Sequence, residues 1–327
     1  MKRRTRSLTS LAALATVVPL AACGLEPASG YAPPVAPAGI EEIEGAGDVT
    51  ITVGAKNFTE QLLLGKIAVL ALRAAGYHVT DATNIPGSAA AREAMLSGNT
   101  DVQWEYTGSA WTSYMGQPKI ADFDEQFQAV HDADLENGIT WLEPAPMNNT
   151  YGFAMGPQAA EEIGIDSLSE LAEVPVEERT LCVESEFRSR SDGLEPMLEH
   201  YGIPLDDPQG IPSENISVLD TGAIYQATAN GECNFGEIFT TDGRIQSLDL
   251  TVIEDDRQFF PPYDVAPIVR TEVLEENPEI EEVFAQISPR LDTEQLIELN
   301  GRIDVEGQEP ADVAMDWLVE EGLVSRG

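Results

Sequence analysis

Four tyrosines, Tyr106, Tyr151, Tyr225 and Tyr263, fall at or near predicted strand ends and turns of the 327-residue chain. The face of an aromatic ring attracts a cation and tolerates its methyl groups. A quaternary ammonium group has no N–H to donate, so a binding site must hold it with such faces. Several rings around one cation would form a cage, although a tyrosine taken alone is more often explained by ordinary packing.

Two basic residues could complete this site for a ligand that also carries a carboxylate, as betaines do. Arg190 lies between a predicted strand and a predicted helix start, and its planar guanidinium matches a carboxylate. Lys56 lies where the alternating run 50–55 turns into a helix predicted to open at Thr59. Ligands in open α/β sheets bind beyond the carboxyl ends of strands, so Lys56 is well placed. The alternative for Lys56 is a solvated surface charge.

The sequence contains no recognisable catalytic set. Its three histidines, His78, His131 and His200, are scattered, and the phosphate-binding, dinucleotide-binding, nucleophile-elbow and zinc-protease motifs do not occur. Acidic residues are so abundant that choosing two as acid and base would be arbitrary, and no cluster has metal-ligand spacing. We therefore predict a protein that is not an enzyme and that uses no cofactor or metal.

The first residues indicate export. A basic start, the apolar run 11–20 and the sequence Leu-Ala-Ala-Cys-Gly ending at Gly24 are typical of a lipoprotein signal. We expect cleavage after residue 22 and lipid attachment to Cys23, which would hold the protein at the outer face of the cytoplasmic membrane. The alternative is an ordinary secretory signal with an incidental cysteine.

Residues 23–47 are rich in proline, alanine, glycine and glutamate, and we predict that they form a flexible tether. The formal net charge of the chain is -39. Such a charge repels nucleic acids and anionic membrane surfaces and favours solubility, so we expect a monomer that does not bind nucleic acid. A saline habitat would also explain the acidity.

The remaining chain predicts an α/β fold with two doubly wound lobes. In the first, strands near 50–55, 77–82 and 101–104 alternate with helices near 59–75 and 88–96. In the second, strands near 180–184, 216–219 and 233–239 alternate with helices near 192–201 and 223–230. Amphipathic helices near 277–287, 293–303 and 310–321 are expected to return to the first lobe. We therefore assign lobe I to 48–147 plus 244–327 and lobe II to 148–243.

Cys182 and Cys233 are the remaining cysteines, and each lies in a short apolar run that predicts a strand. In an exported protein two such cysteines commonly pair. We predict a Cys182–Cys233 disulfide, with two buried free thiols as the alternative.

Six segments together resemble the substrate-binding proteins of quaternary-amine ABC importers, the glycine betaine/carnitine/choline type. They are KNFTEQ at 56–61, EYTGS at 105–109, NNTY at 148–151, R-x-DG at 190–193, TTDGRI at 240–245 and FFPPYDVAP at 259–267. The resemblance implies a type II periplasmic-binding-protein fold, a Venus flytrap that closes on an osmoprotectant and delivers it to a membrane permease.

Carried over by motif, the resemblance implies a cage of Tyr106, Tyr151, Tyr225 and Tyr263. Lys56 and Arg190 would contact the ligand carboxylate, with Thr107 or Ser109 as a lesser donor. Alternatives are a sensory or orphan binding protein for a related ligand such as choline, an enzyme on the same scaffold, and a purely structural lipoprotein.

Overall fold

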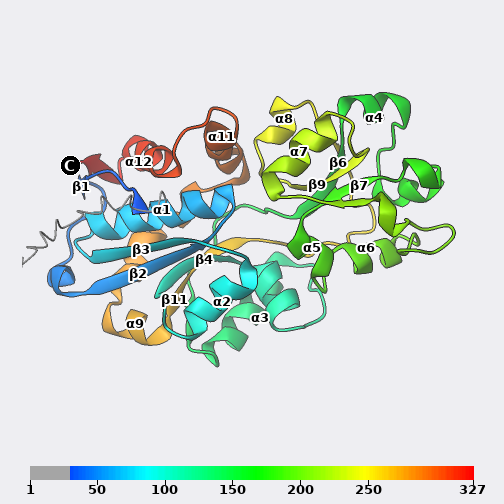
Figure 1. The fold of residues 1–327 in the computed structure, drawn as a ribbon. Coiled ribbons are helices and arrows are strands. Elements are labelled where there is room, and N and C mark those ends of the chain that lie inside the picture. Colours follow the sequence, from blue (N-terminus) through cyan, green and yellow to red (C-terminus); the bar gives the residue numbers. More distant parts are fainter. Residues whose placement is uncertain (1–29) are drawn as a thin grey trace, which may run out of the picture.

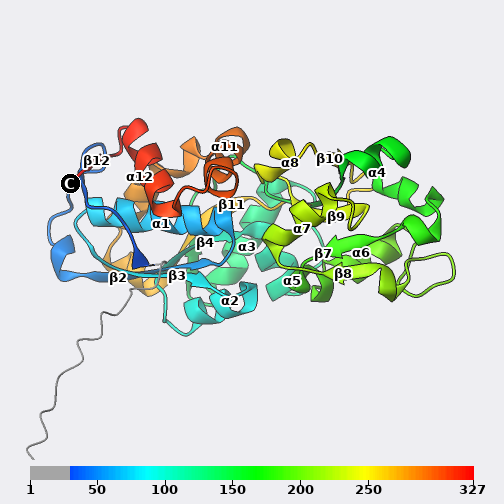
Figure 2. The same ribbon diagram turned by 45° about the horizontal axis from the view of Figure 1, so that its top comes forward.

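The computed structural model of the protein describes residues 30–327 and has two α/β lobes that lie side by side (Figures 1 and 2). Each lobe is built on a five-stranded sheet, which confirms the predicted fold class. The predicted signal segment and Cys23 lie outside the described residues. None of the helices in residues 30–327 is long and apolar enough to cross a membrane.

The sheet of lobe I has the strand order β3-β2-β4-β11-β5. Its strands are β2 (Thr50–Lys56), β3 (His78–Ile85), β4 (Val102–Tyr106), β5 (Ile139–Trp141) and β11 (Val265–Arg270). The first three of these along the chain run parallel, whereas β11 is antiparallel to β4 and β5. Because Val265 pairs with Tyr106, the segment that precedes β11 reaches the carboxyl end of β4.

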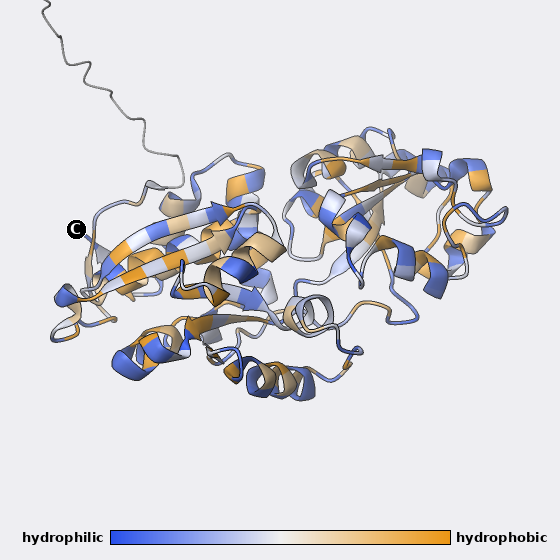
Figure 3. Cartoon of the chain, turned by 60° about the horizontal axis from the view of Figure 1, so that its bottom comes forward, coloured by the Kyte–Doolittle hydropathy of each residue, from blue (hydrophilic) through white to orange (hydrophobic). Residues whose placement is uncertain are grey.

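The central helix of lobe I is α1 (Thr59–Ala74), whose residues from Leu63 to Leu72 are almost all buried and apolar. It packs against β2 and β3, and α11 (Thr293–Asp304) and α12 (Pro310–Glu320) cover it on the other side (Figure 1). The last helices of the chain thus return to lobe I, as predicted. Hydrophilic residues gather on the outward helix faces and loops of both lobes (Figure 3).

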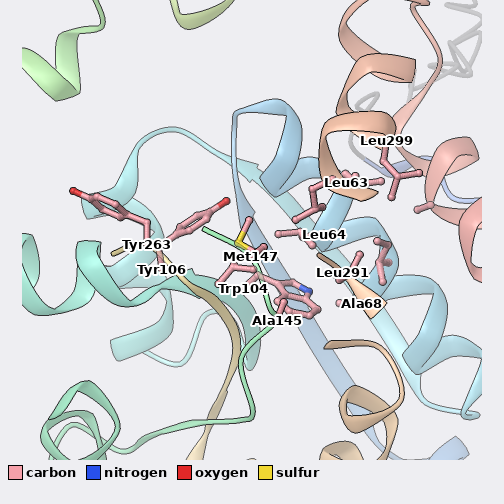
Figure 4. Packing of buried hydrophobic residues seen from close by; sticks show 14 of the residues in the cluster. Leu63, Leu64, Ala68, Trp104, Tyr106, Ala145, Met147, Tyr263, Leu291 and Leu299 are labelled. Carbon is pink, nitrogen blue, oxygen red and sulfur yellow. The ribbon is translucent and has the colours of Figure 1, made fainter. Parts of the chain in front are cut away.

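The apolar core of lobe I extends along β4 toward the second lobe (Figure 4). The indole of Trp104 meets Phe284 edge-on, with ring centroids 5.6 Å apart, and Leu63 belongs to the same cluster. Tyr106 and Tyr263 lie at one end of the residues labelled in Figure 4. Burial of apolar surface therefore fixes the end of β4, from which Tyr106 reaches the space between the lobes.

The sheet of lobe II has the order β10-β6-β9-β7-β8. Its strands are β6 (Tyr151–Met155), β7 (Leu181–Val183), β8 (Ile216–Val218), β9 (Phe235–Phe239) and β10 (Thr251–Ile253). Here β7, β8 and β9 are parallel and β6 is antiparallel to its neighbours, so the two lobes share one strand pattern.

The other α-helices agree with most of the predicted helical segments. They are α2 (Ser88–Leu96), α3 (Phe123–Leu135), α4 (Pro157–Glu162), α5 (Ser185–Ser189), α6 (Leu194–His200), α7 (Thr221–Ala229), α8 (Arg244–Ser247), α9 (Thr271–Glu276) and α10 (Glu279–Ala285). A π-helical turn, Ser109–Tyr114, follows β4.

The predicted end of lobe II at residue 243 is wrong. β10 pairs antiparallel with β6, so the chain stays in lobe II through Ile253. Leu250, just before β10, is buried against Tyr225 and Ala154 of lobe II. The second crossing between the lobes therefore runs between β10 and β11, and the first runs between β5 and β6.

The predicted flexible tether is also contradicted over the part that the structure describes. β1 (Val35–Pro37) pairs antiparallel with β12 (Val324–Arg326), and Ile40 and Ala46 are buried in the core of lobe I. These contacts join both ends of the described chain to one side of lobe I. Residues 30–47 are thus part of the folded lobe.

The structure joins Cys182 of β7 to Cys233, which precedes β9, in a disulfide with 5.7 Å between the Cα atoms. Because β7 and β9 are neighbouring strands, the two cysteines meet beside the sheet of lobe II. They pack with Ile224 and Ala227 of α7 in a small buried cluster.

Candidate functional site

A cavity of about 820 Å³ lies between the two lobes. Its walls include the carboxyl ends of β2, β4 and β9, the amino ends of α1, α2, α5 and α7, part of α11, and the two crossings between the lobes. Strand ends and helix starts converge there because both sheets direct their carboxyl ends toward the crossings. This is where open α/β sheets place their ligands.

Five aromatic rings line this cavity and follow one another in an arc, which we call the aromatic arc. Its members are Tyr106, Phe58, Phe239, Tyr151 and Tyr263. Consecutive ring centroids are 6.1, 5.3, 5.3 and 5.6 Å apart in that order. A continuous set of ring faces and edges of this size can surround a small organic cation.

Each ring of the arc is held by the end of an element or by a crossing. Tyr106 is the last residue of β4, Phe239 the last of β9, and Tyr151 the first of β6. Phe58 precedes the first residue of α1, and Tyr263 lies in the second crossing. The arc therefore draws on both lobes, so a change in their relative position would open or close it.

Lys56 also lines the cavity, at the end of β2. Its ammonium group is buried and bonds to the carboxylate of Glu105 at 2.5 Å. The same ammonium lies 5.1 Å from the centroid of the Tyr106 ring. Tyr114 donates its hydroxyl hydrogen to the same carboxylate at 2.9 Å. Glu105 therefore holds the lysine in place and balances its positive charge.

Arg190 is buried behind the arc and is not among the residues that line the cavity. It donates to both oxygens of Asp192 at 2.7 Å and to Glu186 at 3.3 Å, and its guanidinium lies 5.3 Å from the centre of the Tyr151 ring. Burial raises the pKa of Asp192, but the bonds from Arg190, Thr112 and Tyr263 together outweigh burial and hold that pKa below its usual value.

Of the lesser donors predicted from the sequence, Ser109 lines the cavity and its hydroxyl lies 3.5 Å from the guanidinium of Arg190. Thr107 does not line it. Its hydroxyl donates to the carbonyl of Pro262 and accepts from Gln126, deep in lobe I. The prediction that Thr107 faces a ligand is therefore corrected by this packing.

Tyr225 is likewise outside the cavity lining. It lies within α7, its ring packs in the core of lobe II, and the guanidinium of Arg244 covers the ring at 4.2 Å. Its hydroxyl accepts the backbone N–H of Phe239 at 2.8 Å. The structure thus gives Tyr225 the role of fixing the end of β9, and Phe239 takes the position in the arc that we predicted for Tyr225.

Glu60, in the first turn of α1, was not singled out from the sequence. It lines the cavity, yet its carboxylate is buried and accepts four hydrogen bonds. The donors are Tyr106, Asn149, Thr241 and Asn300. Burial raises its pKa, and these four bonds only partly offset the rise.

The lining as a whole is acidic. Among the described residues it includes the carboxylates of Glu60, Glu184, Glu186, Asp220, Asp242 and Asp304, against the two cations of Lys56 and Arg244. Behind it, burial raises the pKa of Glu237 to about 8. Such a cavity attracts cations and disfavours ligands that carry only negative charge.

The lobes touch on both sides of the cavity. At one side the hydroxyl of Thr112 in lobe I donates to Asp192 in lobe II at 2.7 Å. At the other, a Cβ on Gly243 would lie 2.5 Å from the Cα of Gly301, so no other residue fits there without moving α11 away from lobe II. The close backbone contact at this glycine pair sets the distance between the lobes.

A family model described as the substrate binding domain of ABC-type glycine betaine transport system matches residues 49–320. The chain is 38% identical over 286 residues to the glycine-betaine-binding protein of Pseudomonas aeruginosa, covering 85% of this chain and 90% of that protein. It is 31% identical over 279 residues to the glycine betaine-binding protein YehZ of Escherichia coli, covering 83% and 90%.

Solved structures show the same fold. The ligand-free structure of YehZ has a TM-score of 0.60 and 30% identity, and the match covers 84% of this chain and 99% of that one. A crystal structure titled as a glycine betaine/carnitine/choline ABC transporter has a TM-score of 0.67 at 24% identity, covering 83% and 98%. At 24% identity, the match to this crystal structure shows only that the folds are alike, and that fold agrees with the predicted flytrap architecture.

Proposed function

Since the chain belongs to the family of substrate-binding domains of ABC-type glycine betaine transport systems, we propose that its aromatic arc holds the quaternary ammonium group of an osmoprotectant. The chain is the substrate-binding component of a glycine betaine/carnitine/choline importer. Glycine betaine is the ligand that we propose. The observation that carries this proposal is the aromatic arc in a cavity lined by more carboxylates than cations.

The arc and the acidic lining act on the same part of the ligand. Ring faces stabilise a cation by up to about 2 kcal/mol each when water is excluded. The methyl groups of a quaternary ammonium group gain from contact with the apolar rings, which a strongly hydrated ammonium would not. Closure of the lobes would complete the arc around the ligand, because Phe58 comes from lobe I and Phe239 from lobe II.

Lys56 and Arg190 are proposed to meet the ligand carboxylate. Lys56 does so from the cavity wall. Arg190 holds Asp192 with two of its nitrogens and contacts Glu186 with the third at 3.3 Å, the longest of its bonds to these acids. A carboxylate of the ligand would take the place of Glu186, whose side chain is partly exposed and returns to water.

We expect Arg190→Ala to weaken the binding of glycine betaine by about tenfold to a hundredfold, which is the usual size of a lost charge-assisted hydrogen bond. Choline carries no carboxylate, so its dissociation constant should stay within about threefold or decrease. Calorimetric titration of both ligands measures the difference. Arg188→Ala, which removes an arginine of α5 that does not line the cavity, serves as the matched control.

Equal losses for glycine betaine and choline would contradict the role of Arg190 and leave the arc in place. If neither ligand binds the unaltered protein, the proposed ligand class is wrong. The two outcomes separate the carboxylate contact from the recognition of the ammonium group.

Its place in the family makes the chain an extracytoplasmic transport protein, and an ABC permease is the partner that it implies. We propose that it reaches this partner as a monomer, held at the membrane by a lipid on Cys23. We also propose that it performs no chemistry on its ligand, since its family is one of substrate-binding domains of transport systems.

A further inference from the structure

Glu60 is the buried charge around which the inner wall of the cavity is assembled. Its two oxygens accept from the Tyr106 hydroxyl at 2.7 Å, Asn149 at 2.9 Å, the Thr241 hydroxyl at 2.5 Å and Asn300 at 3.1 Å. These four donors come from β4, the first crossing, the segment after β9, and α11. One carboxylate therefore joins both lobes and the first crossing.

The chemistry of the partners favours an ionised Glu60. One amide N–H group lies on each carboxylate oxygen, and an amide nitrogen can only donate. Asn300 also donates to the carbonyl of Thr241 at 3.1 Å, which fixes the orientation of its amide. The carbonyl oxygens of Asn149 and Asn300 are buried without a partner as a result. The protein thus leaves two acceptors unsatisfied to supply four donors to one carboxylate.

No cation among the described residues balances this charge. Among residues 30–327, no lysine, arginine or histidine forms an ion pair with Glu60. The nearby basic residues already have acids of their own: Lys56 bonds to Glu105, and Arg244 bonds to Asp242 and Asp304. The amino end of α1 offers only a partial positive charge. Buried charges are normally paired, so a buried carboxylate on a cavity wall that has hydrogen-bond donors but no ion pair among the described residues is unusual.

We propose that Glu60 is the counter-charge of the ligand, so that the quaternary ammonium group forms an ion pair with it when the ligand binds. This inference rests on the proposed function. The carboxylate lines the cavity beside the aromatic arc, and the two cations of the same lining are bonded to other acids, Lys56 to Glu105 and Arg244 to Asp242 and Asp304. The Glu60 carboxylate would attract the ammonium group across the cavity without touching it. Closure removes water from the cavity, and charges attract one another more strongly where water is absent.

Glu60 also acts through Tyr106. The phenol of Tyr106 belongs to the arc and donates its proton to the carboxylate at 2.7 Å. A phenol that donates to an anion carries more electron density on its ring, which strengthens its attraction for a cation. The carboxylate therefore adds selectivity for positive charge to an arc whose apolar faces would also accept a neutral group of the same shape.

The test compares two ligands that differ only in charge at the head group. Glycine betaine carries a trimethylammonium group, and 3,3-dimethylbutyrate carries a tert-butyl group of the same shape on the same acetate. The charge preference is the ratio of their dissociation constants, measured by calorimetry. We expect Glu60→Gln to lower this preference about tenfold or more, because glycine betaine loses affinity while the neutral isostere keeps or gains it.

Two controls separate charge from structure. Thr241→Val removes one donor to Glu60 and leaves its charge, so both ligands should lose affinity by a similar factor and the preference should stay within about threefold. Asp132→Asn removes the same charge from an exposed position on α3, and it should leave both dissociation constants within about twofold.

A second variant tests the inference if Glu60→Gln does not fold. Asn300→Lys keeps Glu60 and places an ammonium next to it, since the amide of Asn300 already lies 3.1 Å from the carboxylate. The charge preference should again fall about tenfold or more. Any affinity lost because the lysine is larger would also be lost by 3,3-dimethylbutyrate, so it would not change the ratio.

An unchanged preference in a folded Glu60→Gln or Asn300→Lys protein, while the unaltered protein binds glycine betaine, would overturn the inference and leave the proposed function standing. If the unaltered protein binds neither ligand, the proposed function fails and the inference fails with it. A fall in preference equal to that of Thr241→Val would also overturn it, because the loss would then come from the network and not from the charge.

Discussion

Replacing Tyr151 by alanine is expected to weaken the binding of glycine betaine by about 30- to 150-fold, which corresponds to about 2 to 3 kcal/mol. Tyr151 is the ring of the arc with the most aromatic neighbours among the described residues, since it contacts Phe187 at 4.9 Å and Phe260 at 6.1 Å in addition to Phe239 at 5.3 Å and Tyr263 at 5.6 Å in the arc. Its loss removes a face for the cation and one ring contact from each of its neighbours in the arc. Calorimetric titration of the variant measures the effect.

Tyr151→Phe is the matched control for this variant. It keeps the ring and removes the hydroxyl, for which the structure gives no hydrogen-bond partner among the described residues. Affinity should therefore stay within about threefold of that of the unaltered protein. Equal losses in the two variants would mean that the hydroxyl binds the ligand, and full affinity in Tyr151→Ala would exclude the ring from the site.

Removing the disulfide is expected to lower the free energy of unfolding by about 4 kcal/mol, as loop-closure entropy predicts for a loop of this length. Cys182 and Cys233 are 51 residues apart in sequence, and both are buried. The double variant Cys182→Ala/Cys233→Ala would be compared with the oxidised protein by urea unfolding. The usual stability of a domain is only 5 to about 15 kcal/mol, so the loss would be large.

Ligand binding provides the control for this second prediction. The bond packs against α7 in lobe II and neither cysteine lines the cavity, so the folded double variant should bind glycine betaine with nearly unchanged affinity. If titration of the denatured, unreduced protein detects two free thiols, the disulfide does not exist. Unchanged stability on its removal would contradict its structural role.

Most helices could be predicted because their apolar periodicity is local. The segment predicted as 88–96 is α2 with those bounds, and 293–303 is α11 to within one residue. β11 was not predicted, because Pro267 lies inside it and proline argues against a strand within a sheet. The structure tolerates Pro267 because the pairing of β11 with β5 begins only at Ile268.

The lobe boundary and the ordered start of the chain depend on long-range contacts that no local pattern reveals. β10 is three residues long and is defined by its pairing with β6, which precedes it by about a hundred residues. β1 exists because it pairs with β12 at the other end of the chain. Proline-rich composition predicted a tether there, and tertiary pairing overrode that composition.

Three of the four cage tyrosines line the cavity, and the fourth does not because α7 turns Tyr225 into the core of lobe II. The cage predicted from the sequence contains only tyrosines and omits Phe58 and Phe239, although a cation needs only a ring face. Phe58 belongs to the segment KNFTEQ, one of the six that resemble the family. Glu60 stood there too, but its four donors come from distant segments, so its role is visible only in three dimensions.

The most direct test of the aromatic arc is the affinity of the unaltered protein for glycine betaine and for the same molecule with one, two and three methyl groups removed. Each N–H that replaces a methyl group keeps its water and loses apolar contact with the rings. We predict that calorimetry will show affinity falling at each step, by about tenfold for the first methyl group. Equal or tighter binding of dimethylglycine would contradict recognition by an aromatic arc.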